Sequence, residues 1–124
     1  HASLLPRHRG WQPIFFSCWN QDNVGISIHL VDSGLDTGPI AHQAQLRVQA
    51  TDTLRSLYAR ARFAILQGFV ELMPYLRANN LQGRTQPLDG GSFHSKSEFL
   101  KLYPKLANGW DSEVQEIHAI RQAE

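Results

Sequence analysis

Residues 28–40 read IHLVDSGLDTGPI, and an earlier stretch, residues 1–10, reads HASLLPRHRG. Apolar residues alternate with polar ones into the beginning of residues 28–40, which is the period-two pattern of a half-buried strand. The pattern breaks at Asp32-Ser33-Gly34, a combination typical of a turn, and a second strand is predicted from Pro39. We therefore expect two strands joined by a loop that carries Asp36.

Helices are predicted on both sides of this strand pair, and residues 1–12 are expected to be a loop. Pro13 suits the first position of a short helix over residues 14–19. The longest helix is expected to have its N-cap at Thr51 or Asp52 and to kink or end near Pro74. Its apolar stripe consists of Leu54, Leu57, Tyr58, Ala61, Ile65, Phe69, Leu72 and Leu76.

Two more helices are predicted in the tail. Ser95 is the expected N-cap of a helix through Leu102, with Glu98 completing a capping box. Asp111 is the expected cap of a last helix, residues 112–122. The tail is otherwise rich in loops.

Composition limits the class of protein. The 124 residues are 42% hydrophobic and 19% charged, with a formal net charge of +1, so no overall field favours nucleic acid or an anionic membrane. The single cysteine, Cys18, excludes an internal disulfide and is typical of a reducing compartment. No apolar run has the length of a membrane span. We expect a cytoplasmic protein of one domain at most.

The two quoted stretches resemble the catalytic core of the folate-dependent formyltransferases, because SLLPxxRG is followed by IHxVDxGLDTGPI in the same order. The resemblance implies an α/β fold in which residues 1–80 are the C-terminal half of a Rossmann-like formyltransferase domain. Residues 81–124 are then a loop-rich, helical tail. The predicted strands are too few for a complete doubly wound sheet. In the family an asparagine lies two residues before the histidine that corresponds to His1, so we expect the second half of the enzyme.

The resemblance implies catalytic roles for His1 and Asp36. Formyl transfer to an amine needs a donor for the developing oxyanion and a group that moves a proton. A histidine does both near neutral pH, and a neighbouring carboxylate favours its charged form. His1 is therefore the expected oxyanion donor and proton relay, and Asp36 the carboxylate that tunes it.

The resemblance also implies the formyl donor 10-formyltetrahydrofolate, bound by the loop around Asp36. The cofactor contacts implied in this way are Leu4, Val31, Asp32, Gly34, Leu35 and Asp36. We expect no metal, since no histidine pair has metal-ligand spacing and one cysteine cannot build a site.

Two motifs resemble those of nucleotide-sugar N-formyltransferases, which act in surface polysaccharide (lipopolysaccharide) synthesis: RGWQP at residues 9–13 and GSFHSKSEF at residues 91–99. The implied substrate is a nucleotide-linked amino deoxysugar. Aromatic rings can stack on a base or a sugar, and an imidazole can bind a phosphate or hydroxyl. The expected substrate contacts are Arg9, Gly10, Trp11, Phe93 and His94. A homodimer is compatible with the resemblance; nucleic acid and membrane partners are not expected.

Two alternatives stay open. A methionyl-tRNA formyltransferase or another folate-dependent formyltransferase shares the core motifs. A non-catalytic fragment is the alternative from another class, since the family's asparagine would precede residue 1. Two of the other histidines, His29 and His42, are interpreted as structural histidines, and Cys18 as part of a packed helix face rather than a nucleophile.

Overall fold

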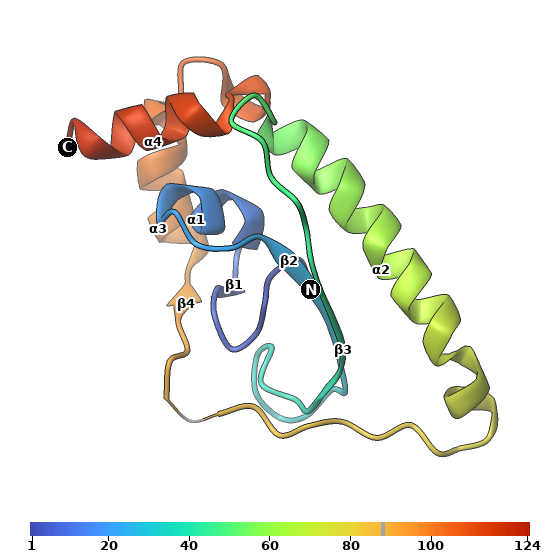
Figure 1. The fold of residues 1–124 in the computed structure, drawn as a ribbon. Helices are drawn as coiled ribbons and strands as arrows, with labels where there is room; N and C mark the ends of the chain where they lie inside the picture. Colours follow the sequence, from blue (N-terminus) through green and yellow to red (C-terminus); the bar gives the residue numbers. More distant parts are fainter. Residues whose placement is uncertain (88) are drawn as a thin grey trace.

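An antiparallel hairpin of β2 (Gly25–His29) and β3 (Ile40–Gln45) lies at the centre of the α/β fold, which we describe from a computed structural model (Figure 1). The structure describes residues 1–87 and 89–124. Both strands are where the alternation predicts them. The register shifts between Ile28 and His29, and a bulge of this kind re-aims the chain. The chain then enters the loop 30–39, which carries Asp36.

A second pair of strands joins the two ends of the sequence. β1 (Arg9–Gly10) runs parallel to β4 (Phe93–His94), with Arg9 opposite Phe93 and Gly10 opposite His94. Residues 9–10 were expected to be loop, which is wrong, because a two-residue strand has no period to detect. Figure 1 shows the segment after the longest helix running back below the hairpin to reach β4.

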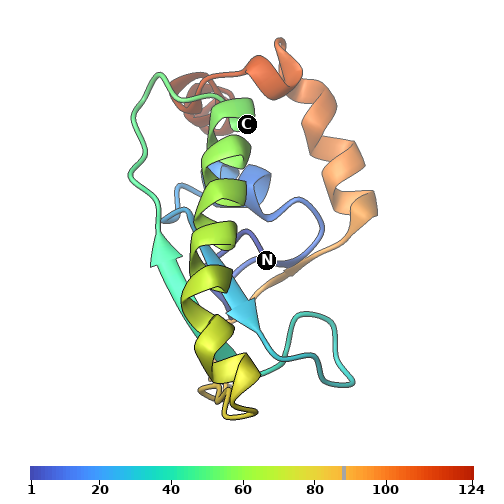
Figure 2. The ribbon, with the colours of Figure 1, turned by 90° about the vertical axis from the view of Figure 1, so that its right-hand side faces the viewer.

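The longest helix, α2 (Leu54–Arg77), lies across the hairpin (Figure 2). Its N-cap is Thr53, not Thr51 or Asp52. The Thr53 hydroxyl accepts from the Ser56 amide at 3.0 Å, and the Ser56 hydroxyl accepts from the Thr53 amide at 2.9 Å. Asp52 has another role, since its carboxylate pairs with Arg60 at 2.7 Å. The reciprocal bonds satisfy two free helix amides and so set the start of the helix.

The buried stripe of α2 differs in its second half from the predicted one. Phe69 and Leu76 are 47% and 41% exposed, whereas Gly68 is buried. A β-carbon at residue 68 would lie 2.6 Å from the His42 ring. The helix therefore approaches the hairpin at a residue without a side chain, a contact that a search for apolar residues does not detect. Pro74 lies inside the helix, which continues to Arg77.

The tail helices are α3 (Lys96–Leu102) and α4 (Val114–Gln122), separated by two short 3-10 helices, η1 (Tyr103–Lys105) and η2 (Gly109–Asp111). Ser95 caps α3 as predicted, but the Glu98 carboxylate accepts from the His94 ring instead of closing a capping box. The predicted cap of α4, Asp111, is wrong. Glu113 caps α4 with Glu116, and Asp111 pairs with Arg55 at 2.8 Å.

One core connects the tail with the rest of the chain. The helix α1 (Pro13–Trp19) is buried along its whole length. The Phe15 ring meets Phe16 and Phe99 edge to face, with centroids 5.1 and 5.2 Å apart. Aromatic pairs favour this geometry. Residues from α2, α3 and α4 complete the cluster: Leu54, Leu57, Ala61, Phe99, Val114 and Ile117. Residues 81–124 therefore share the core of residues 1–80.

Among the described residues, no helix combines the length and the apolar character that a membrane span requires.

Replacing Phe15 with alanine should lower the free energy of unfolding by about 3–5 kcal/mol, because the ring is fully buried. The matched control is Phe63→Ala on α2, whose ring is 63% exposed and whose loss should cost about 0.5 kcal/mol or less. Urea unfolding followed by circular dichroism measures both. Equal losses would show that the core is not organised around α1.

Candidate active site

Asp36 is the centre of the candidate site. Its backbone adopts the left-handed conformation, with φ of 59°, which is uncommon for a residue other than glycine and is more accessible to aspartate than to most. The carboxylate is 19% exposed. One of its oxygens, Oδ2, accepts a hydrogen bond from the Gly10 amide at 2.9 Å. This bond thus holds the Asp36 carboxylate against strand β1.

His1 faces the same carboxylate. Its Nδ1 lies 3.5 Å from Asp36 Oδ2, and its Nε2 lies 2.8 Å from the His8 carbonyl oxygen. Since a carbonyl only accepts, Nε2 carries the hydrogen of that bond. Nδ1 is therefore the ring atom that can take up a proton beside Asp36. The sequence-based pairing of His1 with Asp36 agrees with this arrangement.

His29 approaches Asp36 from the other side. Its Nε2 lies 3.7 Å from Asp36 Oδ1, while Nδ1 donates to the Leu30 carbonyl at 2.9 Å. The second contact fits the structural role expected for His29. The first places it at the candidate site, which the sequence interpretation did not include. Asp36 therefore lies between two imidazoles.

Arg9 and Gln86 hold the backbone at Asp36. The Arg9 guanidinium donates to the Asp36 carbonyl at 3.3 Å and to the Gln86 side-chain oxygen at 2.7 Å. The Gln86 amide donates to the carbonyls of Asp36 and Gly38, at 2.9 and 2.7 Å. Because Gln86 is only 6% exposed, these bonds satisfy carbonyls that water reaches poorly. Arg9, expected to bind substrate, is thus bonded to the backbone of the loop 30–39.

The residues expected to contact the cofactor lie on two sides of Asp36. Val31 and Leu35 are 91% and 60% exposed on the loop 30–39. Asp32 shapes the loop, since its carboxylate accepts from Gly34 and Thr37 at 2.9 and 2.6 Å. The Thr37 hydroxyl is the main cause that lowers the pKa of Asp32.

Leu4 lies on the other side of the site, in the loop before β1. Its side chain packs against Gly25 of β2. Buried Ser27 holds this loop in place, because its hydroxyl donates to the Ser3 carbonyl at 2.7 Å and accepts from the Leu5 amide at 3.0 Å. Leu4 is therefore positioned by the strand that also carries His29.

The residues expected to contact substrate lie along β1 and β4, next to Asp36. Trp11 and Phe93 are 42% and 55% exposed, and the Lys96 ammonium lies 5.5 Å from the Trp11 ring centroid. Gly10 has φ of 92°, and a β-carbon there would meet the His94 carbonyl at 2.4 Å and Phe93 at 2.8 Å. Only glycine fits this position. Two aromatic rings and a cation therefore lie along β1 and β4, beside the strand whose Gly10 amide bonds to Asp36.

His94 differs from the expectation of substrate contact. Its ring is buried against Phe16, with centroids 3.9 Å apart. Its Nε2 bonds to His8 at 3.0 Å and its Nδ1 to Glu98 at 3.1 Å. In this arrangement the ring has no nitrogen available for a substrate, because the tertiary structure turns it inward.

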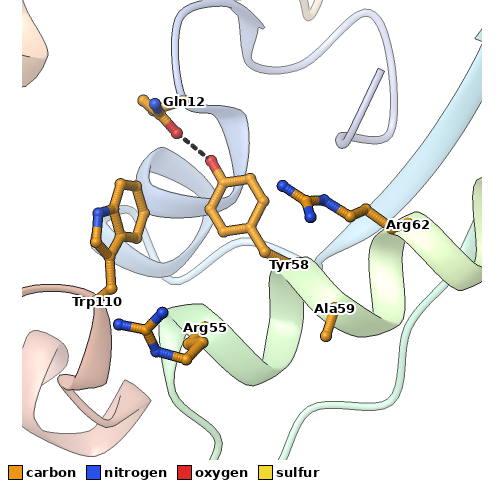
Figure 3. A pocket seen from close by; sticks show the side chains of 6 residues that line it. All are labelled: Gln12, Arg55, Tyr58, Ala59, Arg62 and Trp110. Carbon is orange, nitrogen blue, oxygen red and sulfur yellow. Dashed lines mark hydrogen bonds between the residues drawn. The ribbon is translucent and has the colours of Figure 1, made fainter.

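A separate hollow of about 420 Å³ lies at the start of α2 (Figure 3). The Tyr58 hydroxyl donates to the Gln12 side chain, and the Tyr58 and Trp110 rings meet edge to face at 5.3 Å. The residues that line it are Gln12, Arg55, Tyr58, Ala59, Arg62 and Trp110. None of them belongs to the predicted catalytic, cofactor or substrate set.

Cys18 agrees with its interpretation as a packed residue. It is 2% exposed, and burial raises the pKa of its thiol to about 12. Since the thiolate is the nucleophilic form, Cys18 is inert at neutral pH.

Sequence reasoning missed Gln86, His8 and Asp22. Gln86 lies in a loop-rich segment and carries no motif. His8 forms part of the stretch HASLLPRHRG, but its partners Asp22 and His94 lie 14 and 86 residues away. No local spacing reveals such contacts, so these residues could be found only in three dimensions.

Replacing Gln86 with leucine should loosen the loop 30–39, because the Gly38 carbonyl loses its donor and the Asp36 carbonyl keeps only the longer bond from Arg9. The expected cost is about 1–3 kcal/mol in local stability. Amide hydrogen exchange measures this directly: the Gly10 amide, which donates to Asp36, should exchange faster. Gln82→Leu, at an exposed position in the same segment, is the control. Unchanged exchange at Gly10 in the Gln86 variant would contradict the positioning role.

Comparison with known proteins agrees with this geometry. A sequence model of the formyl transferase family matches residues 1–73. The chain is 38% identical over 97 residues to the methionyl-tRNA formyltransferase of Bordetella petrii, covering 77% of this chain and 30% of the relative. It is 33% identical over 122 residues to the cytosolic 10-formyltetrahydrofolate dehydrogenase of Xenopus laevis, covering 95% of this chain and 13% of the relative.

Solved structures are similar over nearly the whole chain. The formyltransferase PseJ from Anoxybacillus kamchatkensis, in complex with UDP-4,6-dideoxy-4-formamido-L-AltNAc and tetrahydrofolate, matches with a TM-score of 0.88 and 38% identity, covering 94% of this chain and 61% of that one. A sugar N-formyltransferase from Shewanella matches with a TM-score of 0.79 and 26% identity, covering 98% and 49%.

These matches confirm the expected α/β formyltransferase fold, of which the chain represents a part. It spans less than two thirds of each of these relatives. Because the family model covers more than half of the chain, and because His1 and Asp36 meet as the family motif implies, the chain belongs to the formyl transferase family.

Proposed function

We propose that this chain carries the proton-transfer half of a formyltransferase site. The whole protein then moves a formyl group from 10-formyltetrahydrofolate to the amine of a nucleotide-linked amino deoxysugar. One observation carries the proposal: Nδ1 of His1 lies 3.5 Å from a carboxylate oxygen that the Gly10 amide and the Arg9–Gln86 bonds hold in place.

The chemistry of the pair follows from its geometry. An imidazole beside a carboxylate binds a proton more tightly than an imidazole alone, because the negative charge stabilises the imidazolium. The His1 imidazolium donates to the oxygen that becomes negative when the amine attacks the formyl carbon. As the bond to the folate nitrogen breaks, His1 gives its proton to that nitrogen, and the proton that the amine loses restores the imidazolium. Asp36 keeps the ring oriented and supplies the compensating charge. His29 Nε2 lies 3.7 Å from the other carboxylate oxygen, Oδ1.

The loop 30–39 is suited to a folate. Val31 and Leu35 present exposed apolar side chains on either side of the Asp32 turn, and an aromatic ring system is recognised by apolar contacts together with a few polar groups. The formyl donor supplies the activated one-carbon group. Leu4, against β2, lies across the site from the loop.

The amine substrate is assigned from the surface beside Asp36. Trp11, Phe93 and Lys96 combine two exposed rings with a cation, and a nucleotide offers a planar base and phosphates to such a surface. The similar PseJ was solved with a UDP-linked formamido sugar and tetrahydrofolate, which supports this substrate class.

A second candidate acceptor is an aminoacyl-tRNA. It is favoured by the 38% identity to a methionyl-tRNA formyltransferase. The two candidates differ in what the aromatic surface must bind, so they are separated by assaying both amines.

In the complete protein, Asp36→Asn should lower kcat by a factor of about 10²–10⁴, the usual contribution of general acid–base catalysis. The isosteric amide keeps the shape of the loop while removing the charge beside His1. Formylated product is measured by mass spectrometry with nucleotide-linked amino sugar and, separately, with methionyl-tRNA. Asp111→Asn, an exposed carboxylate paired with Arg55, is the control.

Near-normal turnover by the Asp36 variant would overturn its role. Product from methionyl-tRNA alone would replace the proposed substrate by the second candidate. Absence of product from every amine, with a folded protein, would favour the non-catalytic fragment.

Trp11→Ala should raise KM for the nucleotide-linked sugar about 2- to 12-fold, the equivalent of one lost aromatic stack, with little change in kcat. Steady-state kinetics with the free amino sugar as a second substrate provides the comparison, because a substrate without the base should lose nothing. An unchanged KM for the nucleotide-linked sugar would place the base elsewhere.

A further inference from the structure

Four side chains form a continuous hydrogen-bonded relay below the candidate site. It runs from Asp22, after α1, through His8 and His94 to Glu98 on α3. The contacts are 2.7 Å from Asp22 Oδ2 to His8 Nε2, 3.0 Å from His8 Nδ1 to His94 Nε2, and 3.1 Å from His94 Nδ1 to Glu98. The two rings are 3% and 8% exposed. We name this set the histidine relay.

The number of protons in the relay follows from its three contacts. A carboxylate accepts, so each outer contact needs one proton. The central contact joins two ring nitrogens and also needs one, because two lone pairs facing each other at 3.0 Å would repel. Two neutral imidazoles carry only two protons, and two imidazoliums carry four, which would place two hydrogens between the rings. Only a pair of rings that carries three protons satisfies all three contacts.

We assign the extra proton to His94 from the contacts of the two rings. Burial lowers the pKa of His8, against the opposing effect of Asp22. The His94 ring lies flat on Phe16, with an interplanar angle of 5°, and an aromatic face attracts a cation. The carboxylate of Glu98 contacts His94 on its outer side. His8 is then the neutral ring that accepts from His94.

We propose that His8 and His94 share one extra proton, as an imidazole–imidazolium pair between two carboxylates, and that this proton fixes β4 against β1 below Asp36. The relay connects the two strands directly, because His8 precedes β1 and His94 ends β4. The His94 carbonyl also accepts from the Trp11 amide at 2.9 Å. His8 and His94 are thus positioning residues for Gly10, whose amide bonds to Asp36.

The shared proton predicts a pH dependence of stability with two limbs. Each histidine has a pKa of about 6.5 in an unfolded chain. Above that pH the unfolded pair holds two protons and the folded pair three, so raising the pH destabilises the fold. Below it the unfolded pair holds four, so lowering the pH also destabilises the fold. The relay therefore stabilises the protein most near about pH 6.5.

Other charges around the relay are few. Arg7 lies 3.4 Å from Asp22 and opposes the extra proton from that side. Asp22 and Glu98 are the two carboxylates in contact with the rings. The His1 ring meets His8 only through the backbone carbonyl. The two carboxylates outweigh the single arginine, so the surroundings favour one bound proton.

The decisive experiment is nitrogen NMR of the histidine rings in the full chain, titrated between about pH 5 and 8. At pH 7 we expect one ring with both nitrogens protonated, His94, and one neutral ring protonated at Nε2, His8. Two neutral rings at pH 7, or two imidazoliums at pH 6, would overturn the proposal. This measurement needs no variant and no turnover, so it is independent of the proposed function.

Unfolding measurements test the positioning role. The ratio of the parent's unfolding equilibrium constant to that of His94→Gln should rise by up to about tenfold per pH unit above pH 6.5. Glu98→Gln keeps an acceptor for the ring but removes the charge. The loss of stability with rising pH should therefore begin at a lower pH in this variant than in the parent. His118→Gln, on α4, is the control. Identical pH profiles for the parent, Glu98→Gln and His118→Gln would contradict the role of the charge.

Exchange of the Gly10 amide gives a second reading. In the folded parent, the exchange rate of the Gly10 amide should increase with pH once the shared proton is lost. This increase should be larger than the intrinsic increase with pH, which is measured at an exposed amide. If it follows the intrinsic rate in parent and variant alike, the relay does not position Asp36.

Discussion

The hydrogen bond from the Gly10 amide to the Asp36 carboxylate is the contact on which the site depends. It joins strand β1 to the loop 30–39, two segments that no regular secondary structure connects. Gly10 can make it because only a glycine fits between the His94 carbonyl and Phe93. Asp36 can make it because Arg9 and Gln86 hold its backbone in the left-handed conformation. The geometry of the candidate site thus rests on bonds between side chains and backbone groups.

Histidines and carboxylates are divided between two settings. His1 and His29 approach the two carboxylate oxygens of Asp36, with side chains that are 10% and 15% exposed. His8 and His94 lie below, enclosed and bonded to Asp22 and Glu98. The two settings differ in hydrogen bonding. Both ring nitrogens of His94 have side-chain partners within 3.1 Å, whereas His1 Nδ1 and His29 Nε2 lie 3.5 and 3.7 Å from Asp36.

Local sequence rules worked where one element has one strong signal. The period-two alternation located β2 and β3, and Ser95 was the correct cap of α3. The rules failed where several residues could fill one role. Thr51, Asp52 and Thr53 are all good N-caps, and the choice of Thr53 depends on Ser56 and on the pairing of Asp52 with Arg60. Glu98 does not close its capping box, because its carboxylate bonds to the His94 ring.

The sequence by itself determined the family, the strand–loop–strand unit and the pairing of His1 with Asp36, because these rest on residues close together or on an ordered motif. Only the tertiary structure decided that Gln86 holds the loop, that His94 turns inward to His8, and that Gly68 lies on the hairpin. Those contacts join residues far apart in the chain, and their energies depend on burial and distance, which no local pattern of residues encodes.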